Sequence, residues 1–325
     1  MVHRGKLIAL HGLGQFTYDS DSSRVTPETI YDLASVTKVV ATTAMCMILF
    51  ERGVLHLEQR VVDVLPEFGI DDRRREAITL QMLLAHSSGL PAHVKLYESA
   101  RNKEELERQA LRVPLTADPG LRTEYSDIGF IVLGIALERL TREPLDQLCH
   151  LEIFARLGMD RMRFNPPPHW SSSIPPTGNE QTLRGHAIQG EVNDDNAWVM
   201  GGVAGHAGVF ATAHDVSVFT RCMLSGGTPL VSPETVKLFT QRQASPSGTS
   251  HALGWDTPSQ PSQSGQYFSP SSYGHLGYTG ASLWIDPERQ LSVTLLTNRT
   301  WPDCRSQLIR QIRPAFHDAI VEALK

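Results

Sequence analysis

A serine and a lysine three residues apart form a pair that could carry out acyl transfer. Ser35 and Lys38 lie in the stretch 32–38, Asp-Leu-Ala-Ser-Val-Thr-Lys. Residues three apart on a helix are neighbours, so the Lys38 ammonium would reach the Ser35 hydroxyl. A serine becomes a nucleophile when a neighbour takes its proton, and a lysine can do so only where burial lowers its pKa. The competing interpretation is an N-capping serine beside a solvated lysine.

The residues that follow the pair predict the helix that must position it. Residues 39–50, from Val39 to Phe50, carry no charged side chain. A helix that is apolar on every face is usually buried, which argues against a solvated Lys38. Ser35 would lie in the first turn, where unpaired backbone N–H groups and the helix dipole favour negative charge. Such a helix start suits an attacked carbonyl.

Length and composition indicate a globular chain with ample core. The chain has 325 residues, of which 41% are hydrophobic, enough for two lobes or one large domain. The net charge of −5 and the pI near 6.2 give no basic face, so we expect no nucleic-acid partner. No apolar run is expected to reach the length of a membrane span. The cysteines lack metal spacing and are interpreted as packing residues: Cys46, Cys149, Cys222 and Cys304.

The first residues contain no export signal. Residues 1–5 lead directly into the apolar-biased residues 6–10, and five such residues are too few for a signal-peptide core. The sequence as it stands predicts a cytoplasmic location. A longer native N-terminus would instead allow a periplasmic or secreted protein.

Hydrophobic periodicity predicts strands at both ends of the chain and helices between them. This order implies an α+β fold in which the two termini share one antiparallel sheet. We expect a mixed lobe from 1–50 and 205–325 and an inserted, mostly helical lobe from 51–204, as one structural unit. The expected strands are 6–19 (two, around the glycines at 12 and 14), 273–278, 282–285 and 291–297; the expected helices are 80–85, 103–112, 128–141, 145–157, 215–224, 233–241 and 303–324.

The helix that begins near Ser35 would join the two lobes, so its first turn should lie in the cleft between them, a favoured place for ligands. Two other stretches are interpreted structurally. The proline-rich residues 163–185 are expected to form surface loop. The glycine-rich residues 201–208 fit neither nucleotide-binding pattern, and we expect tight packing there.

Two further motifs complete an ordered set. Tyr125 and Asp127 precede an apolar helix, and His275 and Gly277 lie on a strand expected to border the cleft. Together with Ser35, they resemble the penicillin-recognising serine hydrolases: class C β-lactamases, serine D-peptidases, penicillin-binding proteins and related carboxylesterases. The resemblance covers nearly the whole chain and implies the β-lactamase/penicillin-binding-protein-like fold. It also includes the stretches 84–91 and 201–208.

The resemblance implies roles for the residues that match the family's motifs Ser-x-x-Lys, Tyr-x-Asn and Lys-Thr-Gly. Ser35 would be the acylated nucleophile. Lys38 and Tyr125 would share a proton network, and which of them is the base stays open because coupled groups titrate as a pair. The backbone N–H groups of Ser35 and Tyr278 would form the oxyanion hole. Asp127, His275 and Gly277 would contact substrate, and no metal or cofactor is implied.

Two departures from the motifs bear on the substrate. Asp127 stands where the family usually has asparagine, so a carboxylate could hold Lys38 charged. His275 stands where the third motif usually has lysine, which leaves a titratable anchor for a substrate carboxylate. Histidine at this position resembles the D-peptidase and esterase-like branches more than dedicated β-lactamases. Lowering the pH toward 6 is expected to protonate His275 and partly restore the missing cation.

Other polar and aromatic residues have simpler interpretations. His86 and His206 lie in apolar or glycine-rich contexts and are expected to be structural. The pair 194–195, Asp-Asp, could cap a loop or face the cleft mouth. The tryptophans are interpreted as sheet-packing residues, with lining of the acyl pocket as the alternative: Trp255 and Trp284.

The sequence therefore predicts a serine hydrolase that cleaves small carboxylic esters, with weak action on β-lactams. A β-lactamase or D-peptidase of the same family is the first alternative, because esters, β-lactams and D-peptides all present an acyl carbonyl to one serine. A non-catalytic binder of peptidoglycan fragments would not need Ser35, Lys38 and Tyr125 together. A metallohydrolase is disfavoured because the 13 histidines show no ligand spacing. The oligomeric state stays open.

Overall fold

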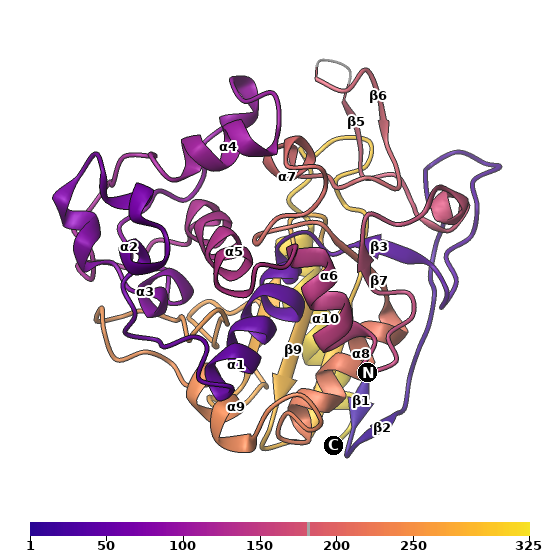
Figure 1. Ribbon diagram of the computed structural model, residues 1–325. Coiled ribbons are helices and arrows are strands. Elements are labelled where there is room, and N and C mark those ends of the chain that lie inside the picture. The colour runs from indigo at the N-terminus through magenta and orange to yellow at the C-terminus, as the bar shows by residue number, and fades with distance from the viewer. Residues whose placement is uncertain (181–182) are drawn as a thin grey trace.

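The main sheet joins the two ends of the chain. The computed structural model describes residues 1–180 and 183–325 (Figure 1). Five antiparallel strands follow the order β2-β1-β10-β9-β8, and β1 pairs with β10, which confirms the shared sheet. These strands are β1 (Val2–His3), β2 (Lys6–Leu7), β8 (Tyr273–Leu276), β9 (Ser282–Asp286) and β10 (Leu291–Leu295).

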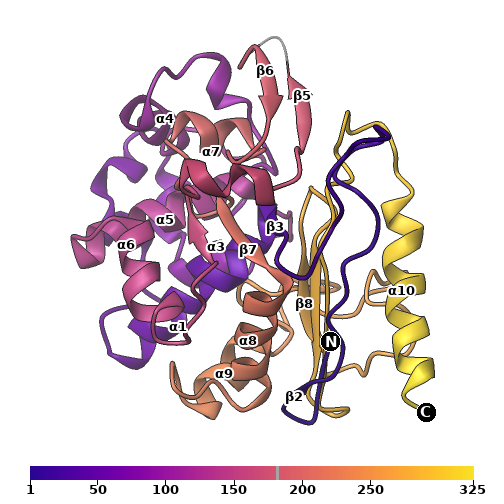
Figure 2. The same cartoon turned by 90° about the vertical axis from the view of Figure 1, so that its right-hand side faces the viewer.

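Helices cover both faces of this sheet. The C-terminal helix α10 (Ile309–Ala323) lies on the outer face, and α8 (Ala213–Leu224) and α9 (Pro233–Thr240) lie on the side of the rest of the protein (Figure 2). In α10 every fourth residue is buried, the spacing of one helix face: Ile309, Arg313, His317 and Val321. The final helix is thus confirmed, with a later start than expected.

The remaining helices surround the apolar helix α5 (Asp127–Thr141), capped by the Ser126 hydroxyl, which accepts the Gly129 N–H at 2.9 Å. Gly205 packs directly on α5, because a Cβ there would meet the Phe130 carbonyl oxygen at 2.1 Å. The glycine-rich run therefore packs tightly, as predicted. The other helices are α2 (Val61–Val64), α3 (Leu80–Leu84), α4 (Lys103–Ala110), α6 (Leu145–Cys149) and α7 (Asp195–Val199).

Two smaller sheets correct the sequence-based expectations. The three-stranded sheet has the order β3-β7-β4, and β5 pairs with β6. Several of these strands lie within residues predicted as helical lobe or loop, where two or three paired residues leave no periodic signal. Residues 163–185 thus carry strands and a 3₁₀ turn, although residues 181 and 182 lie outside the described part. The strands are β3 (Ile30–Asp32), β4 (Arg163–Phe164), β5 (Gly178–Glu180), β6 (His186–Ile188) and β7 (Val209–Thr212).

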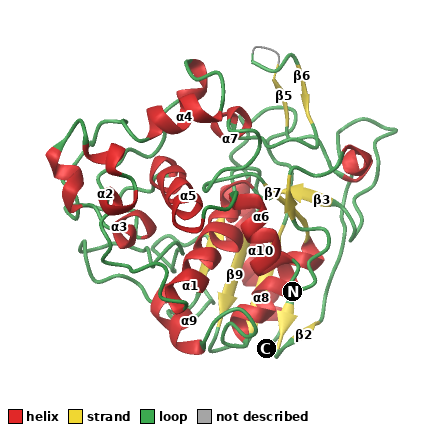
Figure 3. Cartoon of the chain, in the orientation of Figure 1, coloured by secondary structure: helices red, strands yellow, loops and turns green. Residues whose placement is uncertain are grey.

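Two further expectations are wrong. The two strands predicted over 6–19 are replaced by the short β2 (Lys6–Leu7) and a long loop that runs on to β3 (Figure 3). Glycines at 12 and 14 suit that loop as well as a hairpin turn, so the pattern was ambiguous. Cys304 is exposed, whereas the other three cysteines are buried packing residues as predicted.

The predicted buried helix begins as a 3₁₀ turn (Ala34–Val36), continues as π-helix (Lys38–Thr43) and ends as α1 (Ala44–Glu51). π-helical segments often occur at functional sites. By length and composition the 18 residues Ala34–Glu51 could cross a membrane, so the expectation that no apolar run is that long is corrected. Because 83% of this window is buried, its apolar side chains already pack within the protein.

Ala34 holds a strained conformation that turns the chain into this helix. Its φ of 47° lies in the left-handed region, which costs an L-residue about 1–2 kcal/mol. The Ala34 N–H donates to Asp32 Oδ1 at 2.8 Å, and the Thr279 hydroxyl donates to the Asp32 carbonyl oxygen at 2.8 Å. These bonds fix the backbone immediately before Ser35.

We expect Ala34→Gly to leave the free energy of unfolding nearly unchanged. Relief of the left-handed strain offsets the roughly 1 kcal/mol that glycine normally costs. The matched control is Ala44→Gly, because Ala44 is also buried but has φ −58°, and it should lose about 1 kcal/mol or more. Urea denaturation measures both. Equal losses in the two variants would show that Ala34 stores no strain.

Candidate active site

The predicted site residues gather at one cleft with a volume of 1660 Å³. They come from the helix start (Ser35), the beginning of α5 (Tyr125, Asp127) and the end of β8. Lys38 lies beneath the cleft floor and is 0% exposed. The cleft lining includes Ser35, Tyr125, Asp127, His275, Gly277 and Tyr278.

Lys38 makes polar contacts with Ser35, Asp127 and the His206 backbone, and it also interacts with the Tyr125 side chain. Its Nζ lies 3.0 Å from Ser35 Oγ, 2.7 Å from Asp127 Oδ1 and 3.1 Å from the His206 carbonyl oxygen. Burial acts to lower the pKa of Lys38, but the charges of Asp127 and then Tyr125 raise it, and the net shift is upward. Lys38 is therefore charged at neutral pH, and the condition of a lowered lysine pKa is not met. The notion of a solvated lysine is also wrong.

Asp127 is an ionised carboxylate. Burial acts to raise its pKa, but Lys38 and then the hydrogen bond to His93 lower it, and the net pKa lies far below the ordinary value. The carboxylate is only 17% exposed. Asp127 thus holds Lys38 in the charged form, as the departure from asparagine suggested.

Tyr125 lies over Lys38 and retains its proton in the resting protein. Lys38 Nζ is 4.9 Å from the centre of the Tyr125 ring, close enough for a cation–π contact. Burial raises the pKa of Tyr125 to about 12, while Lys38 works to lower it. The ring also contacts His86, with centroids 4.7 Å apart. His86 is buried, and its Nδ1 accepts the Ser126 N–H at 3.0 Å, a structural role as predicted.

His275 is buried and neutral. Burial, followed by the charge of Lys38, lowers the pKa of His275 to about 3. Its Nδ1 lies 2.8 Å from the Leu276 carbonyl oxygen, which can only accept, so Nδ1 carries the proton. The expectation that pH 6 would protonate His275 is therefore wrong, because desolvation moves its titration to far lower pH.

The turn after β8 packs against the backbone that precedes Ser35. A Cβ on Gly277 would meet the Leu33 carbonyl oxygen at 2.5 Å, so only glycine fits. The Gly280 N–H closes the turn on the Gly277 carbonyl at 3.0 Å. This close packing brings Tyr278 to the same cleft as Ser35.

Two adjacent aspartates form an acidic wall of the cleft. Asp194 and Asp195 line the cleft, and Asp194 also caps α7 by accepting the Ala197 N–H at 2.8 Å. Both predicted roles, cap and cleft mouth, thus apply. His206 Nε2 lies 2.8 Å from Asp194 Oδ1, so His206 supports the wall and contacts Lys38 through its carbonyl.

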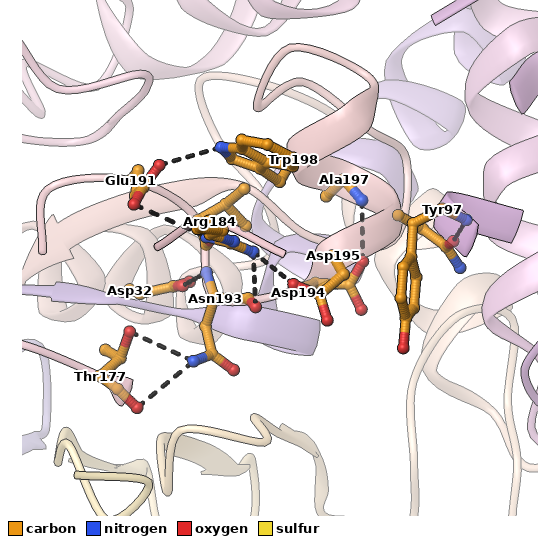
Figure 4. A network of polar contacts seen from close by, with 12 residues as sticks. Asp32, Tyr97, Thr177, Arg184, Glu191, Asn193, Asp194, Asp195, Ala197 and Trp198 are labelled. Carbon is orange, nitrogen blue, oxygen red and sulfur yellow. Dashed lines mark hydrogen bonds and ion pairs between the residues drawn. The ribbon is translucent and has the colours of Figure 1, made fainter. Parts of the chain in front are cut away.

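A polar network fixes the acidic wall (Figure 4). Arg184 donates to the carbonyls of Val192 and Asn193 and to Asp195 Oδ1, the last at 2.8 Å. The Asn193 N–H donates to Asp32 Oδ2 at 2.7 Å. Burial raises the pKa of Asp32 to about 6. The wall is therefore tied to the same aspartate that holds Ala34.

Sequence reasoning missed several cleft residues. No spacing signal marked the exposed His93, the pair His251 and Asp256, or Arg299, which reach the cleft from loops. The tryptophans lie elsewhere: Trp255 packs on Phe219 and Tyr273 and Trp284 on Phe268, so the sheet-packing interpretation is confirmed.

One group in the cleft could hold a metal ion. Ligand atoms of His93, Asp127 and Asp194 lie within 4.8 Å of one another, and imidazole with two carboxylates is a donor set that zinc accepts. Each of these ligands already has a protein partner, because Asp127 pairs with Lys38 and with His93, and Asp194 pairs with His206.

Comparison with known proteins agrees with this arrangement. The family model "Beta-lactamase" matches residues 1–315. A protein of Escherichia coli (strain K12), whose name gives the activity D-alanyl-D-alanine carboxypeptidase as provisional, is 31% identical over 307 residues, which are 85% of this chain and 70% of that protein.

Solved structures share the fold. The octameric penicillin-binding protein homologue from Pyrococcus abyssi has a TM-score of 0.73 and 21% identity, covering 99% of this chain and 71% of that one. EstCE1, described as a hydrolase with promiscuous acyltransferase activity, has a TM-score of 0.68 and 21% identity over 90% and 86% of the two chains. The α+β fold of β-lactamases and penicillin-binding proteins is thus confirmed, and the chain belongs to the beta-lactamase family of serine hydrolases.

Proposed function

We propose that this chain hydrolyses small carboxylic esters through an acyl-enzyme on Ser35. The observation that carries the proposal is the neutral, buried His275 at the third motif, where a fixed cation would be needed to bind the carboxylate of a penicillin. Asp127 and Asp195 line the cleft and already pair with Lys38 and Arg184, so they compete with a substrate carboxylate for these two cations. A simple ester carries no such group.

In this proposal Ser35 Oγ attacks the ester carbonyl, and the N–H groups of Ser35 and Tyr278 stabilise the oxyanion. Removing one such donor typically costs about 10²–10³ in rate. Because Lys38 is charged and Tyr125 is protonated at rest, Tyr125 must first lose its proton to solvent, and the adjacent ammonium stabilises the resulting anion. We assign this Tyr125 anion as the base, which takes the Ser35 proton and passes it to the departing alcohol. It then takes a proton from the water that cleaves the acyl-enzyme and returns that proton to Ser35.

A second candidate is hydrolysis of D-peptides with a free carboxylate. It is favoured by Arg299 and Arg310, which line the cleft, and by the name of the Escherichia coli relative. Arginine binds carboxylates in bidentate fashion. Arg299 lies beside the turn after β8, where its Nε donates to the Tyr278 carbonyl at 2.7 Å.

The test exposes the protein in parallel to a fluorophosphonate, a penicillin, p-nitrophenyl butyrate and a D-alanyl-D-alanine peptide. Intact mass identifies the acyl adduct, and kcat/KM ranks the turnover. The ester should give the highest kcat/KM. A higher value for the peptide would select the second candidate, and a higher value for the penicillin would overturn the ester proposal.

We expect His275→Lys to raise β-lactam acylation at least about tenfold relative to ester turnover, because a charged hydrogen bond to the carboxylate adds roughly 1.5–3 kcal/mol. The pKa of His275 near 3 means that the unsubstituted protein gains no cation there between pH 7 and pH 6. Its penicillin-to-ester ratio should therefore stay flat over that range. A penicillin-to-ester ratio that rises between pH 7 and pH 6 would contradict this account. A ratio that is the same in His275→Lys and in the unsubstituted protein would also contradict it.

A further inference from the structure

A buried arginine donates to three backbone carbonyls of the turn that follows β8. Arg313 of α10 is 6% exposed. Its guanidinium donates to the carbonyl oxygens of Gly277 at 2.6 Å, Ala281 at 3.0 Å and Gly280 at 3.2 Å. Within the described residues 1–180 and 183–325, no carboxylate forms an ion pair with it. The turn therefore carries an uncompensated positive charge on the side that faces α10.

This arrangement is costly for stability alone. Burying a charge without a counter-ion is unfavourable, and burial together with the charge of Arg299 lowers the pKa of Arg313 to about 10. Arg313 nevertheless stays charged at neutral pH. A neutral donor such as glutamine could satisfy carbonyls without this cost, so the charge needs another explanation.

The charge of Arg313 is explained by the peptide group whose carbonyl accepts its shortest hydrogen bond. The Gly277 carbonyl and the Tyr278 N–H belong to one peptide, and a trans peptide carries them on opposite sides. The carbonyl faces Arg313, so the Tyr278 N–H points away from α10. A charged donor on a carbonyl polarises the amide and strengthens its N–H as a donor. The next peptide is also held, because Arg299 Nε donates to the Tyr278 carbonyl at 2.7 Å.

We propose that Arg313 and Arg299 are positioning residues: Arg313 orients and polarises the Gly277–Tyr278 peptide and Arg299 fixes the peptide that follows it, so that the Tyr278 N–H is a preorganised oxyanion donor. The inference rests on the proposed acylation of Ser35 and deepens it. Neither arginine touches the reacting atoms in this role. Preorganised donors act on charge that develops in the transition state, so their loss should reduce kcat and leave KM unchanged.

The principal test is Arg313→Lys, which keeps the charge but loses the forked geometry that spans three carbonyls. Hydrolysis of p-nitrophenyl butyrate is measured together with inhibition by an alkyl boronic acid, whose serine adduct mimics the tetrahedral oxyanion. We expect kcat to fall at least tenfold, the boronate inhibition constant to rise by a similar factor, and KM to stay within twofold.

Arg75→Lys is the matched control. Arg75 is 1% exposed and likewise donates to three backbone carbonyls, those of Phe68, Leu111 and Val113, far from the turn. The substitution Arg75→Lys should lower the unfolding midpoint about as much as Arg313→Lys does. Its kcat and boronate inhibition should equal those of the unsubstituted protein. An equal loss of boronate affinity in both variants would reduce Arg313 to a stability residue and overturn the proposal.

Arg299→Gln provides a second variant if Arg313→Lys does not fold. Arg299 is partly exposed, and p-nitrophenyl butyrate has no carboxylate that this arginine could bind. We expect a loss of at least threefold in both kcat and boronate affinity. The proposal would be overturned if Arg313→Lys folds and has unchanged kcat and boronate affinity. If Arg313→Lys does not fold, unchanged kcat and boronate affinity in Arg299→Gln would overturn it.

Failure of the proposed function would be recognised separately. An unsubstituted protein that is not labelled at Ser35 by a fluorophosphonate would overturn both. Labelling of the unsubstituted protein, combined with arginine variants of normal kcat and boronate affinity, would overturn only the role of the two arginines.

Discussion

Ser35→Ala is expected to abolish covalent labelling by a fluorophosphonate and to lower ester kcat/KM by about 10³-fold or more, the scale seen when a nucleophile is removed. Ser35 Oγ is the hydroxyl that Lys38 contacts, at 3.0 Å. The substitution removes one half-buried hydrogen-bond acceptor of Lys38 and leaves the Lys38–Asp127 ion pair, so the fold should be retained. Intact mass and thermal unfolding measure the two effects.

The matched control is Ser250→Ala. Ser250 also lines the cleft, where its hydroxyl donates to Asp256 Oδ1 at 2.9 Å beside His251. Ser250 is therefore a second cleft serine that lies near a histidine and a carboxylate. It is the alternative candidate for the nucleophile. The Ser250→Ala variant should still be labelled by the fluorophosphonate to full stoichiometry. Full labelling of Ser35→Ala, or its loss in Ser250→Ala, would refute the assignment of Ser35.

The sequence predicted those parts of the site that depend on spacing within one element. Ser35 and Lys38 are three residues apart on a helix, so their contact follows from helix geometry. That this pair lies close to Tyr125, Asp127 and His275 was predicted only from the resemblance to a family. Local patterns carry no information on which distant segments pack together.

The missed features have a common physical cause. β4 and β6 contain two or three residues each, too few for a period, and their pairing is decided by tertiary contacts. The same applies to His275, whose pKa near 3 arises from burial and from Lys38. A histidine in a sequence suggests titration near pH 6.5, and only its environment shows otherwise.

The strained start of the helix also escaped prediction. Ala34 has a propensity for ordinary helix, yet its φ is positive because Asp32, Thr279 and the turn at Gly277 constrain it together. Such strain persists only where surrounding structure over-determines the backbone, and it tends to occur at functional sites. Its position directly before Ser35 is consistent with the proposed role of that residue.

Lys38 and Tyr125 are expected to behave as one unit in a double-mutant cycle. Lys38 Nζ lies over the Tyr125 ring and contacts Ser35, and each charge shifts the pKa of the other. Lys38→Ala and Tyr125→Phe should each lower kcat by about 10³-fold, within the usual range for proton transfer by a positioned group. The double variant should lose no more than about tenfold beyond either single variant.

A loss of structure must be separated from a loss of proton transfer. Lys38→Ala leaves the Asp127 carboxylate buried without its ion pair, which typically costs about 3–5 kcal/mol, so its unfolding midpoint should fall. Asp127→Asn combined with Lys38→Ala removes that uncompensated charge and should recover stability without recovering kcat. The cycle is then repeated in the Asp127→Asn background. Losses that multiply there to about 10⁶-fold would mean that Lys38 and Tyr125 act independently, and the shared proton network would be wrong.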